Sequence, residues 1–216
     1  MASTPTKRPK FRRRAEARPD EVLDAALDLF IARGFAATRV EDIARRAGLS
    51  KGAVYLYYPS KEAILEALVQ RSILPIAEQV AALGRLETGD PKAALRSLID
   101  LIGDGLAEPR VAAIPKIIVG EAGNFPQLVE SYRRQVIERG LGALTALIRR
   151  GVELGQFRPV DPELAARNVV GPLIAHLLLA RIFSIAPADD PRARRFLDSH
   201  LDILMNGLAA EGERKA

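Results

Sequence analysis

The residues best suited to chemistry lie in one short segment, where small, basic and aromatic side chains follow one another. The segment reads Ser50-Lys51-Gly52-Ala53-Val54-Tyr55, and Tyr57 follows shortly after. A lysine ammonium can donate to the O6 and N7 acceptors of guanine, and small residues let a helix approach the base edges closely. A tyrosine offers its hydroxyl to a phosphate and its ring to a thymine methyl. These residue types therefore suit contact with the major groove of DNA.

Two short helices must position this segment. The first is predicted to begin at a capping box formed by Thr38 and Glu41 and to reach Gly48. The second is predicted to begin at Ser50, a good N-cap, and to end before Pro59. Because only a tight connection at Gly48 joins them, the two helices must cross at a steep angle. That is the helix-turn-helix arrangement.

The run from Arg18 to Glu62 resembles the DNA-binding domain of TetR-family transcriptional regulators. The matching features are Ala25-Ala26, Leu29-Phe30, Gly34-Phe35, Thr38, Ile43-Ala44, Ala47-Gly48-Leu49-Ser50, Gly52, Val54-Tyr55, Tyr57-Tyr58 and Ser60-Lys61-Glu62. The resemblance implies DNA contacts at Thr38, Arg39, Ser50, Lys51, Gly52, Ala53, Tyr55, Tyr57 and Lys61. A mild departure is Tyr58-Pro59, where the family usually has Phe followed by a polar residue.

Individual residues in this set have alternative structural roles. A lone tyrosine on a short helix, such as Tyr55, is more often half-buried in a core than in contact with a base. Thr38 can act as a helix cap, with or without a phosphate contact. Arg39 can be a solvated surface charge. Tyr58 corresponds to the buried aromatic residue of the family.

Positive charge is concentrated near the N-terminus. Residues 1–62 hold 13 Lys and Arg against 8 Asp and Glu, whereas residues 63–216 hold 19 of each kind. This division predicts a basic module that meets a polyanion, followed by an electrically neutral body. Within the module, residues 1–16 are predicted to form a basic flexible arm that can enter the minor groove beside the recognition helix.

The rest of the chain is predicted to be helical throughout, with Pro, Gly and Asp between the helices. Ser60 begins a fourth helix, which Pro75 either kinks as a hinge or ends. The predicted fold is all-α. A three-helix helix-turn-helix domain (residues 17–62) is joined through the fourth helix to a larger ligand-binding and dimerisation domain (63–216) of about nine helices. Later helices are predicted to open at Asp90-Pro91, Glu108-Pro109, Pro126, Asp161-Pro162 and Asp190-Pro191.

The resemblance also implies a homodimer built from the last two helices and a small-molecule pocket in each body. Candidate dimer-interface residues are Gly171, Ile174, Leu178, Phe196, Leu197 and Leu204. Candidate pocket residues are Ile117, Glu121, Phe125, Tyr132, His176 and Phe183. The pocket's composition suits an apolar or amphipathic effector. An ordinary intramolecular core remains the alternative for part of the first set, and a hydrogen-bonded core or interface residue is the alternative for His176.

Several classes of protein are disfavoured by the sequence. With no Cys, the chain lacks thiolate nucleophiles and cysteine metal sites. His176 and His200 lack metal-binding spacing, and there is no Gly-x-Ser-x-Gly nucleophile motif. We therefore expect that the protein is not an enzyme and binds no cofactor or metal. We also expect no membrane span, because the most apolar stretch is short and contains His176. A cytoplasmic location is expected because the absence of Cys is compatible with a reducing compartment.

The sequence thus predicts a dimeric regulator that binds a palindromic double-stranded operator. Repression released by an unidentified small-molecule effector is the predicted mode of action. A nonspecific architectural DNA-binding protein is the alternative, since a basic arm on a helical dimer suits that role too.

Overall fold

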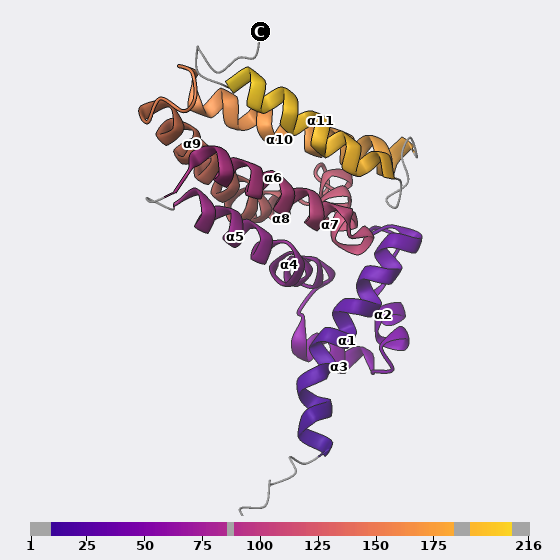
Figure 1. The fold of residues 1–216 in the computed structure, drawn as a ribbon. Coiled ribbons are helices and arrows are strands. Elements are labelled where there is room, and N and C mark those ends of the chain that lie inside the picture. Colours follow the sequence, from indigo (N-terminus) through magenta and orange to yellow (C-terminus); the bar gives the residue numbers. More distant parts are fainter. Residues whose placement is uncertain (1–9, 86–88, 184–190, 209–216) are drawn as a thin grey trace, which may run out of the picture. The chain divides into compact units, whose positions relative to one another are not determined.

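The computed structural model describes residues 10–85, 89–183 and 191–208, and every regular element in those ranges is helical (Figure 1). This confirms the predicted all-α class. The elements in order are α1 (Lys10–Arg33), α2 (Val40–Arg46), α3 (Lys51–Tyr57), α4 (Lys61–Ser72), α5 (Leu74–Gly84), α6 (Pro91–Ala107), α7 (Pro109–Gly120), α8 (Pro126–Tyr132), the π-helical turn η1 (Arg133–Ile137), α9 (Glu138–Glu153), α10 (Pro162–Phe183) and α11 (Pro191–Leu208).

Contacts divide the chain into two compact units, Met1–Leu68 and Val69–Ala216. The division falls within α4, the helix whose first residues the sequence assigned to the border between domains. In the described ranges no helix combines the length and the apolarity needed to cross a membrane.

The first helix differs from the sequence-based expectation at its N-terminal end. α1 begins at Lys10, so residues 10–16 are helical where a flexible arm was predicted, and residues 1–9 lie outside the described residues. Basic residues, Ala and Glu dominate this stretch, and all of them are good helix formers. Pro19 lies inside the helix and removes one backbone donor without ending it.

The core of the first unit forms where α1, α2 and α3 pack against one another. Phe30 and Phe35 lie with ring centroids 5.0 Å apart. Ile43 and Val54 have no exposed surface, so each short helix is anchored by a fully buried aliphatic side chain. Burial of that kind stabilises helices too short to persist alone.

The turn between α2 and α3 requires a glycine. The backbone at Gly48 has φ +66°, which side chains other than glycine rarely adopt. The amide of Leu49 donates to the carbonyl of Ala44 at 2.9 Å and completes the turn. This confirms the predicted helix-turn-helix.

The second unit is organised around α9, which packs along both α5 and α10, while α6 contacts α5, α9 and α11. Two glycines permit close approach. A Cβ atom at Gly84 of α5 would lie 2.6 Å from the backbone oxygen of Ala143. A Cβ atom at Gly151 would lie 2.1 Å from the ring of Phe157. Leu95, Leu98, Ile99, Leu144, Ile148, Ala166 and Val169 are among the residues that make up the core.

Helix starts in the second unit follow the predicted pattern where they are described. The Asp90 carboxylate accepts from the amide of Lys92 at 3.0 Å, and Asp161 accepts from Leu164 at 3.0 Å. Pro75 occupies the first turn of α5 after α4 has ended at Ser72, so the helix ends and restarts there. α9 has no proline or cap at its start, because it continues directly from η1.

Candidate nucleic-acid interface

The recognition helix α3 is bounded by two local features that the sequence predicted. The Ser50 hydroxyl accepts from the amide of Ala53 at 3.1 Å and caps the first turn. Tyr58 is extended at the other end, before Pro59. The helix is therefore seven residues long and presents a single short surface.

That surface is defined by Val54, the fully buried residue of α3. Gly52 and Leu56, four residues apart, lie on the side of the helix opposite Val54, and Tyr55 lies next to them, with Lys51 one turn before Tyr55. Leu56 is 84% exposed, more than Tyr55 at 43% or Tyr57 at 38%. An apolar side chain at the centre of a solvent-facing helix surface suits contact with a thymine methyl.

Leu56 is the functional candidate that sequence reasoning missed. No role was assigned to it from the sequence. A signal was present: Leu56 follows Gly52 by one helical turn and falls away from Val54. Helix-face geometry would have identified it.

Lys51 does not stand alone on this surface. Its ammonium forms an ion pair with the carboxylate of Glu41 on α2, and it lies 5.7 Å from the centroid of the Tyr55 ring. The hydrogen bond from Lys51 lowers the pKa of Glu41, and the same bond raises the pKa of Lys51. Both groups therefore remain charged over the physiological range of pH.

The structure corrects the prediction for Thr38. Its side chain is 2% exposed, and its hydroxyl donates to the carbonyl of Gly34 at 2.7 Å. The N-cap of α2 is instead Arg39, whose side chain makes no capping hydrogen bond. The capping box with Glu41 is therefore wrong. Because its hydroxyl is turned into the protein, the Thr38 side chain is not available to a phosphate, whereas Arg39 is exposed.

Lys61 is also placed differently from the prediction. Its ammonium donates to the carbonyl oxygens of Phe35 at 2.6 Å, Ala36 at 3.2 Å and Thr38 at 3.1 Å. It lies 4.4 Å from the centroid of the Phe35 ring as well. A lysine has three N–H donors, and here each has a carbonyl partner. The geometry therefore gives Lys61 a structural role, holding the loop between α1 and α2, in place of the predicted phosphate contact.

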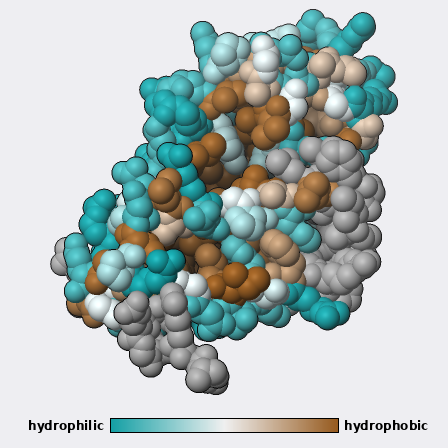
Figure 2. Space-filling model, turned by 90° about the horizontal axis from the view of Figure 1, so that it is seen from above, coloured by the Kyte–Doolittle hydropathy of each residue, from teal (hydrophilic) through white to brown (hydrophobic). Residues whose placement is uncertain are grey.

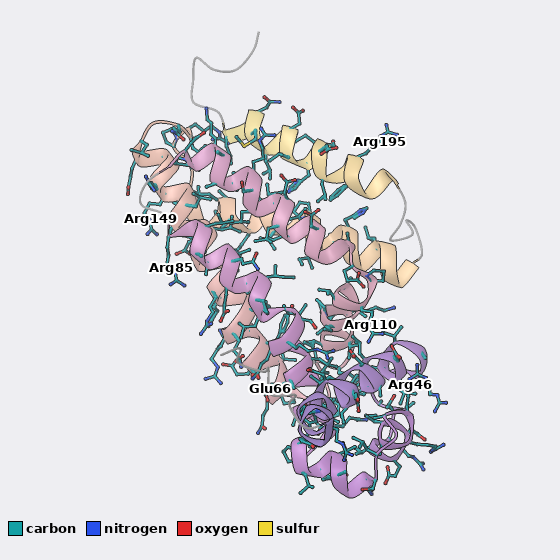
Figure 3. The ribbon with its side chains drawn as sticks, turned by 60° about the horizontal axis from the view of Figure 1, so that its bottom comes forward. Arg46, Glu66, Arg85, Arg110, Arg149 and Arg195 are labelled. Atoms are coloured by element: carbon teal, nitrogen blue, oxygen red, sulfur yellow. The ribbon has the colours of Figure 1, made fainter. Side chains whose placement is uncertain are left out.

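Ion pairs and a hydrogen bond tie the helices of this unit together. Arg46 of α2, labelled in Figure 3, lies 2.6 Å from the carboxylate of Asp28 on α1. The Tyr58 hydroxyl donates to the carbonyl of Pro19 at 3.3 Å. Tyr58 is half-buried, in keeping with the inward position predicted for it.

The predicted pocket residues are distributed over several elements of the second unit. Glu121 ends α7 and accepts from the side-chain amide of Asn124 at 3.1 Å. Ile117 on α7 and Phe125, the N-cap of α8, are half-buried. Tyr132 closes α8 beside η1, and burial raises the pKa of its phenol to about 12. The Phe183 side chain lies outside the described residues.

His176 belongs with the last two helices. Its ring stacks on Phe196 of α11 with centroids 4.2 Å apart and planes 8° from parallel. Phe196 also stacks near His200, whose Nε2 lies 2.9 Å from the carbonyl oxygen of Val169. The contact with Phe196 joins α10 to α11.

The predicted dimer residues divide between inward and outward positions. Leu197 packs on α6, where a Cβ at Gly103 would lie 2.5 Å from its Cδ1, and Leu204 packs against the core. Gly171 is exposed and Ile174 is half-buried, whereas the Leu178 side chain lies outside the described residues. Further apolar side chains are exposed on α10 and α11, namely Leu164 at 58%, Leu179 at 45% and Ile203 at 66%. Figure 2 shows apolar patches among polar ones on the face it presents.

Both units match described protein families. Residues 22–68 match bacterial regulatory proteins of the tetR family, and residues 86–200 match the tetracyclin repressor-like C-terminal domain. RutR of Escherichia coli strain K12, an HTH-type transcriptional regulator, is 31% identical over 157 residues, which cover 71% of this chain and 71% of RutR. These relatives are regulators, which favours regulation over catalysis.

Solved structures share the fold. The SmeT–triclosan complex has a TM-score of 0.74 at 27% identity and covers 91% of this chain and 93% of SmeT. SmeT is described as the repressor of the Stenotrophomonas maltophilia multidrug efflux pump SmeDEF. FadR of Bacillus subtilis, in complex with stearoyl-CoA, has a TM-score of 0.73 at 21% identity and covers 88% of this chain and 98% of FadR.

Proposed function

The chain belongs to the TetR family of transcriptional regulators, and on this premise we propose that it is a sequence-specific repressor whose dimer binds a palindromic operator. α3 enters the major groove, with Lys51, Gly52, Tyr55 and Leu56 toward the base edges. Ser50, Ala53, Tyr57 and Arg39 lie at the margins of this surface and contact the backbone or the neighbouring bases. Thr38 and Lys61 do not contact DNA in this proposal, because their side chains donate hydrogen bonds to backbone carbonyls of the protein.

The observation that carries the proposal is the composition of the exposed face of α3. An exposed helix face is ordinarily polar, yet this one carries an 84% exposed leucine next to a tyrosine, with a lysine one turn before that tyrosine. One donor, one aromatic ring and one apolar group on a helix with a glycine on the same face match the chemical groups of the major groove.

Dimerisation through α10 and α11 supplies the two-fold symmetry. The exposed side chains of Leu164, Leu179 and Ile203 supply apolar surface for a second copy, with Gly171 permitting a close helix approach. Two recognition helices roughly 34 Å apart engage successive major grooves on one face of the duplex. Operator half-sites related by a two-fold axis follow from that symmetry.

A small apolar or amphipathic effector releases the repressor. Half-buried Ile117, Phe125 and Tyr132 supply an apolar lining with one phenol for orientation. The triclosan named in the structure of SmeT supports this effector class, because triclosan is itself a small aromatic molecule with one hydroxyl. Binding that changes the separation of the two recognition helices abolishes their simultaneous contact with DNA.

Selection of bound duplexes from a random pool by the full-length protein tests the proposal. We expect a palindromic site whose affinity falls by about tenfold or more in Tyr55→Ala and Leu56→Ala. Lys51→Met is compared with Lys116→Met, which removes the same charge from an exposed position on α7. Enrichment of no sequence, with affinity that disappears as salt rises, would instead indicate a nonspecific architectural protein.

A further inference from the structure

The ion pair between Glu41 and Lys51 places a carboxylate at the edge of a surface that meets a polyanion. Both side chains are about half exposed, at 50% and 51%. We propose that Glu41 is a specificity-determining residue, which positions the Lys51 ammonium and forms with it a unit that reads a G·C base pair. The inference rests on the proposed function, since it requires α3 to enter the major groove.

Stability does not account for this pair. Exposed ion pairs contribute little to folding free energy, because water screens them and two long side chains must be ordered. The packing of α2 on α3 is already provided by Ile43, Ala44 and Val54, all of them buried. A carboxylate next to the recognition helix also repels phosphate, so its presence lowers affinity for DNA in general. What the pair supplies is discrimination.

Two contacts limit where the Lys51 ammonium can go. Glu41 holds it from α2, and the Tyr55 ring lies 5.7 Å away on the next turn of α3. An unrestrained lysine behaves as a mobile point charge that any phosphate satisfies. Paired with a carboxylate and beside an aromatic ring, the ammonium instead favours one region of the surface of α3.

The donors and acceptors left over match one base pair. A lysine ammonium has three N–H groups, and one pairs with Glu41, so two remain for the O6 and N7 atoms of guanine. The Glu41 carboxylate keeps acceptor sites for the N4 amino group of cytosine. When adenine replaces guanine on the same strand, the N6 amino group takes the place of the O6 acceptor and the thymine O4 takes the place of the cytosine N4 donor, so the pair satisfies the unit less well.

On nonspecific DNA the same pair is unfavourable. If Lys51 turns to a phosphate, Glu41 loses its partner and faces the negative backbone. Glu41→Gln removes this penalty and frees Lys51. We therefore expect the variant to bind random duplex more tightly and to show a salt dependence steeper by up to about one counterion.

The experiment measures affinity of the full-length protein for its selected operator. Each G·C pair of the half-site is replaced in turn by A·T, and a random duplex is included at several salt concentrations. The proteins compared are wild type, Glu41→Gln, Lys51→Met, the double variant and Glu21→Gln. Glu21→Gln is the matched control, because it removes the same charge from an exposed position on α1. Circular dichroism verifies that each variant is folded.

We expect Glu41→Gln to lose about tenfold of its discrimination at one G·C position, the same position at which Lys51→Met loses discrimination. The double variant should lose no more than the larger single loss, because the two residues act as one unit. Glu21→Gln should alter affinity for all duplexes alike.

Unchanged preference at every position in Glu41→Gln, with a uniform gain in affinity equal to that of Glu21→Gln, would overturn the inference while leaving sequence-specific binding intact. If Glu41→Gln and Lys51→Met lose discrimination at two different base pairs, the proposal that the two residues read one base pair together is overturned. If wild type selects no sequence at all, both the inference and the proposed function fail.

Discussion

The two units of this protein solve the problem of placing functional side chains in different ways. In the N-terminal unit, the recognition helix is placed mainly by features within a few residues of it, namely the Ser50 cap, the Gly48 turn and the Val54 anchor, while Lys51 pairs in addition with Glu41 of α2. In the second unit, the candidate residues are placed by helices that are distant in sequence, with α9 packed against both α5 and α10. Contacts between residues close in sequence can be predicted from the sequence, whereas contacts between distant helices cannot.

The difference has a consequence for function. The recognition surface can keep its backbone geometry when its side chains are substituted. Gly52, Tyr55 and Leu56 are exposed to solvent and contribute little to the core. In the second unit, the side chains of the dimer candidates Leu197 and Leu204 pack partly against the protein interior. Substitution there changes packing and binding together.

The largest expected effect tests whether the two units unfold separately. Phe30→Ala removes a ring that is 2% exposed, and Leu144→Ala removes a side chain with no exposed surface. We expect losses of about 3–5 kcal/mol and about 2–5 kcal/mol, respectively, in free energy of unfolding. Calorimetry should show each substitution lowering the melting temperature of a different transition. One transition that shifts in both variants would mean that the units unfold together.

A second test concerns Lys61, whose ammonium donates to three loop carbonyls. Lys61→Met keeps the stem and removes the donors, so we expect a loss of about 1–3 kcal/mol in urea unfolding of the N-terminal unit. The salt dependence of operator binding should stay the same. If Lys61→Met unfolds as wild type does, but the slope of log affinity against log salt concentration falls by about one, Lys61 contacts a phosphate after all.

The third prediction compares two caps of the same type. Ser50 accepts from Ala53 and Ser60 accepts from Ala63, each at 3.1 Å. Ser50→Ala and Ser60→Ala should each cost about 1 kcal/mol of stability. Only Ser50→Ala should weaken operator binding, because its cap begins α3. Equal loss of DNA affinity in both would show that recognition does not depend on the local cap.

The smallest effect at neutral pH concerns Tyr132. Burial raises the pKa of its phenol from 10.0 to about 12, so the native chain keeps this proton where the unfolded chain loses it. The contribution of this phenol to the free energy of unfolding is therefore fully present below about pH 10, and it is lost as pH rises toward about 12. Absorbance titration of the native protein should show a late phenol step that disappears in Tyr132→Phe. Persistence of that step would assign it to another tyrosine.

Much of the N-terminal unit was predictable from the sequence. Gly48, Ser50 and Pro59 act through the backbone of their own neighbours, so residue type alone indicates the turn, the cap and the helix end. One error arose from the same local reasoning. The spacing of Thr38 and Glu41 suggested a capping box, but Thr38 found a carbonyl at Gly34, and Glu41 found an ammonium on the next helix.

In the second unit, the sequence indicated helices opened by aspartate and proline but missed how α9 begins, because η1 and α9 continue from α8 without a cap. It also gave no indication that His176 stacks on Phe196 or that Leu197 fills the space beside Gly103. Those contacts join helices that are far apart in the chain, and periodicity within one helix does not specify its neighbour.

By itself, the sequence determined the helical class, the helix-turn-helix and the chemical character of α3, because hydrophobic period, glycine conformation and capping act over a few residues. Only the tertiary structure decided which charged groups remain available to DNA. Lys51 and Lys61 are both lysines near helix starts, yet one reaches the surface beside Glu41 and the other is held by three carbonyls. An ammonium binds whichever acceptors folding brings within reach, and most of those lie elsewhere in the chain.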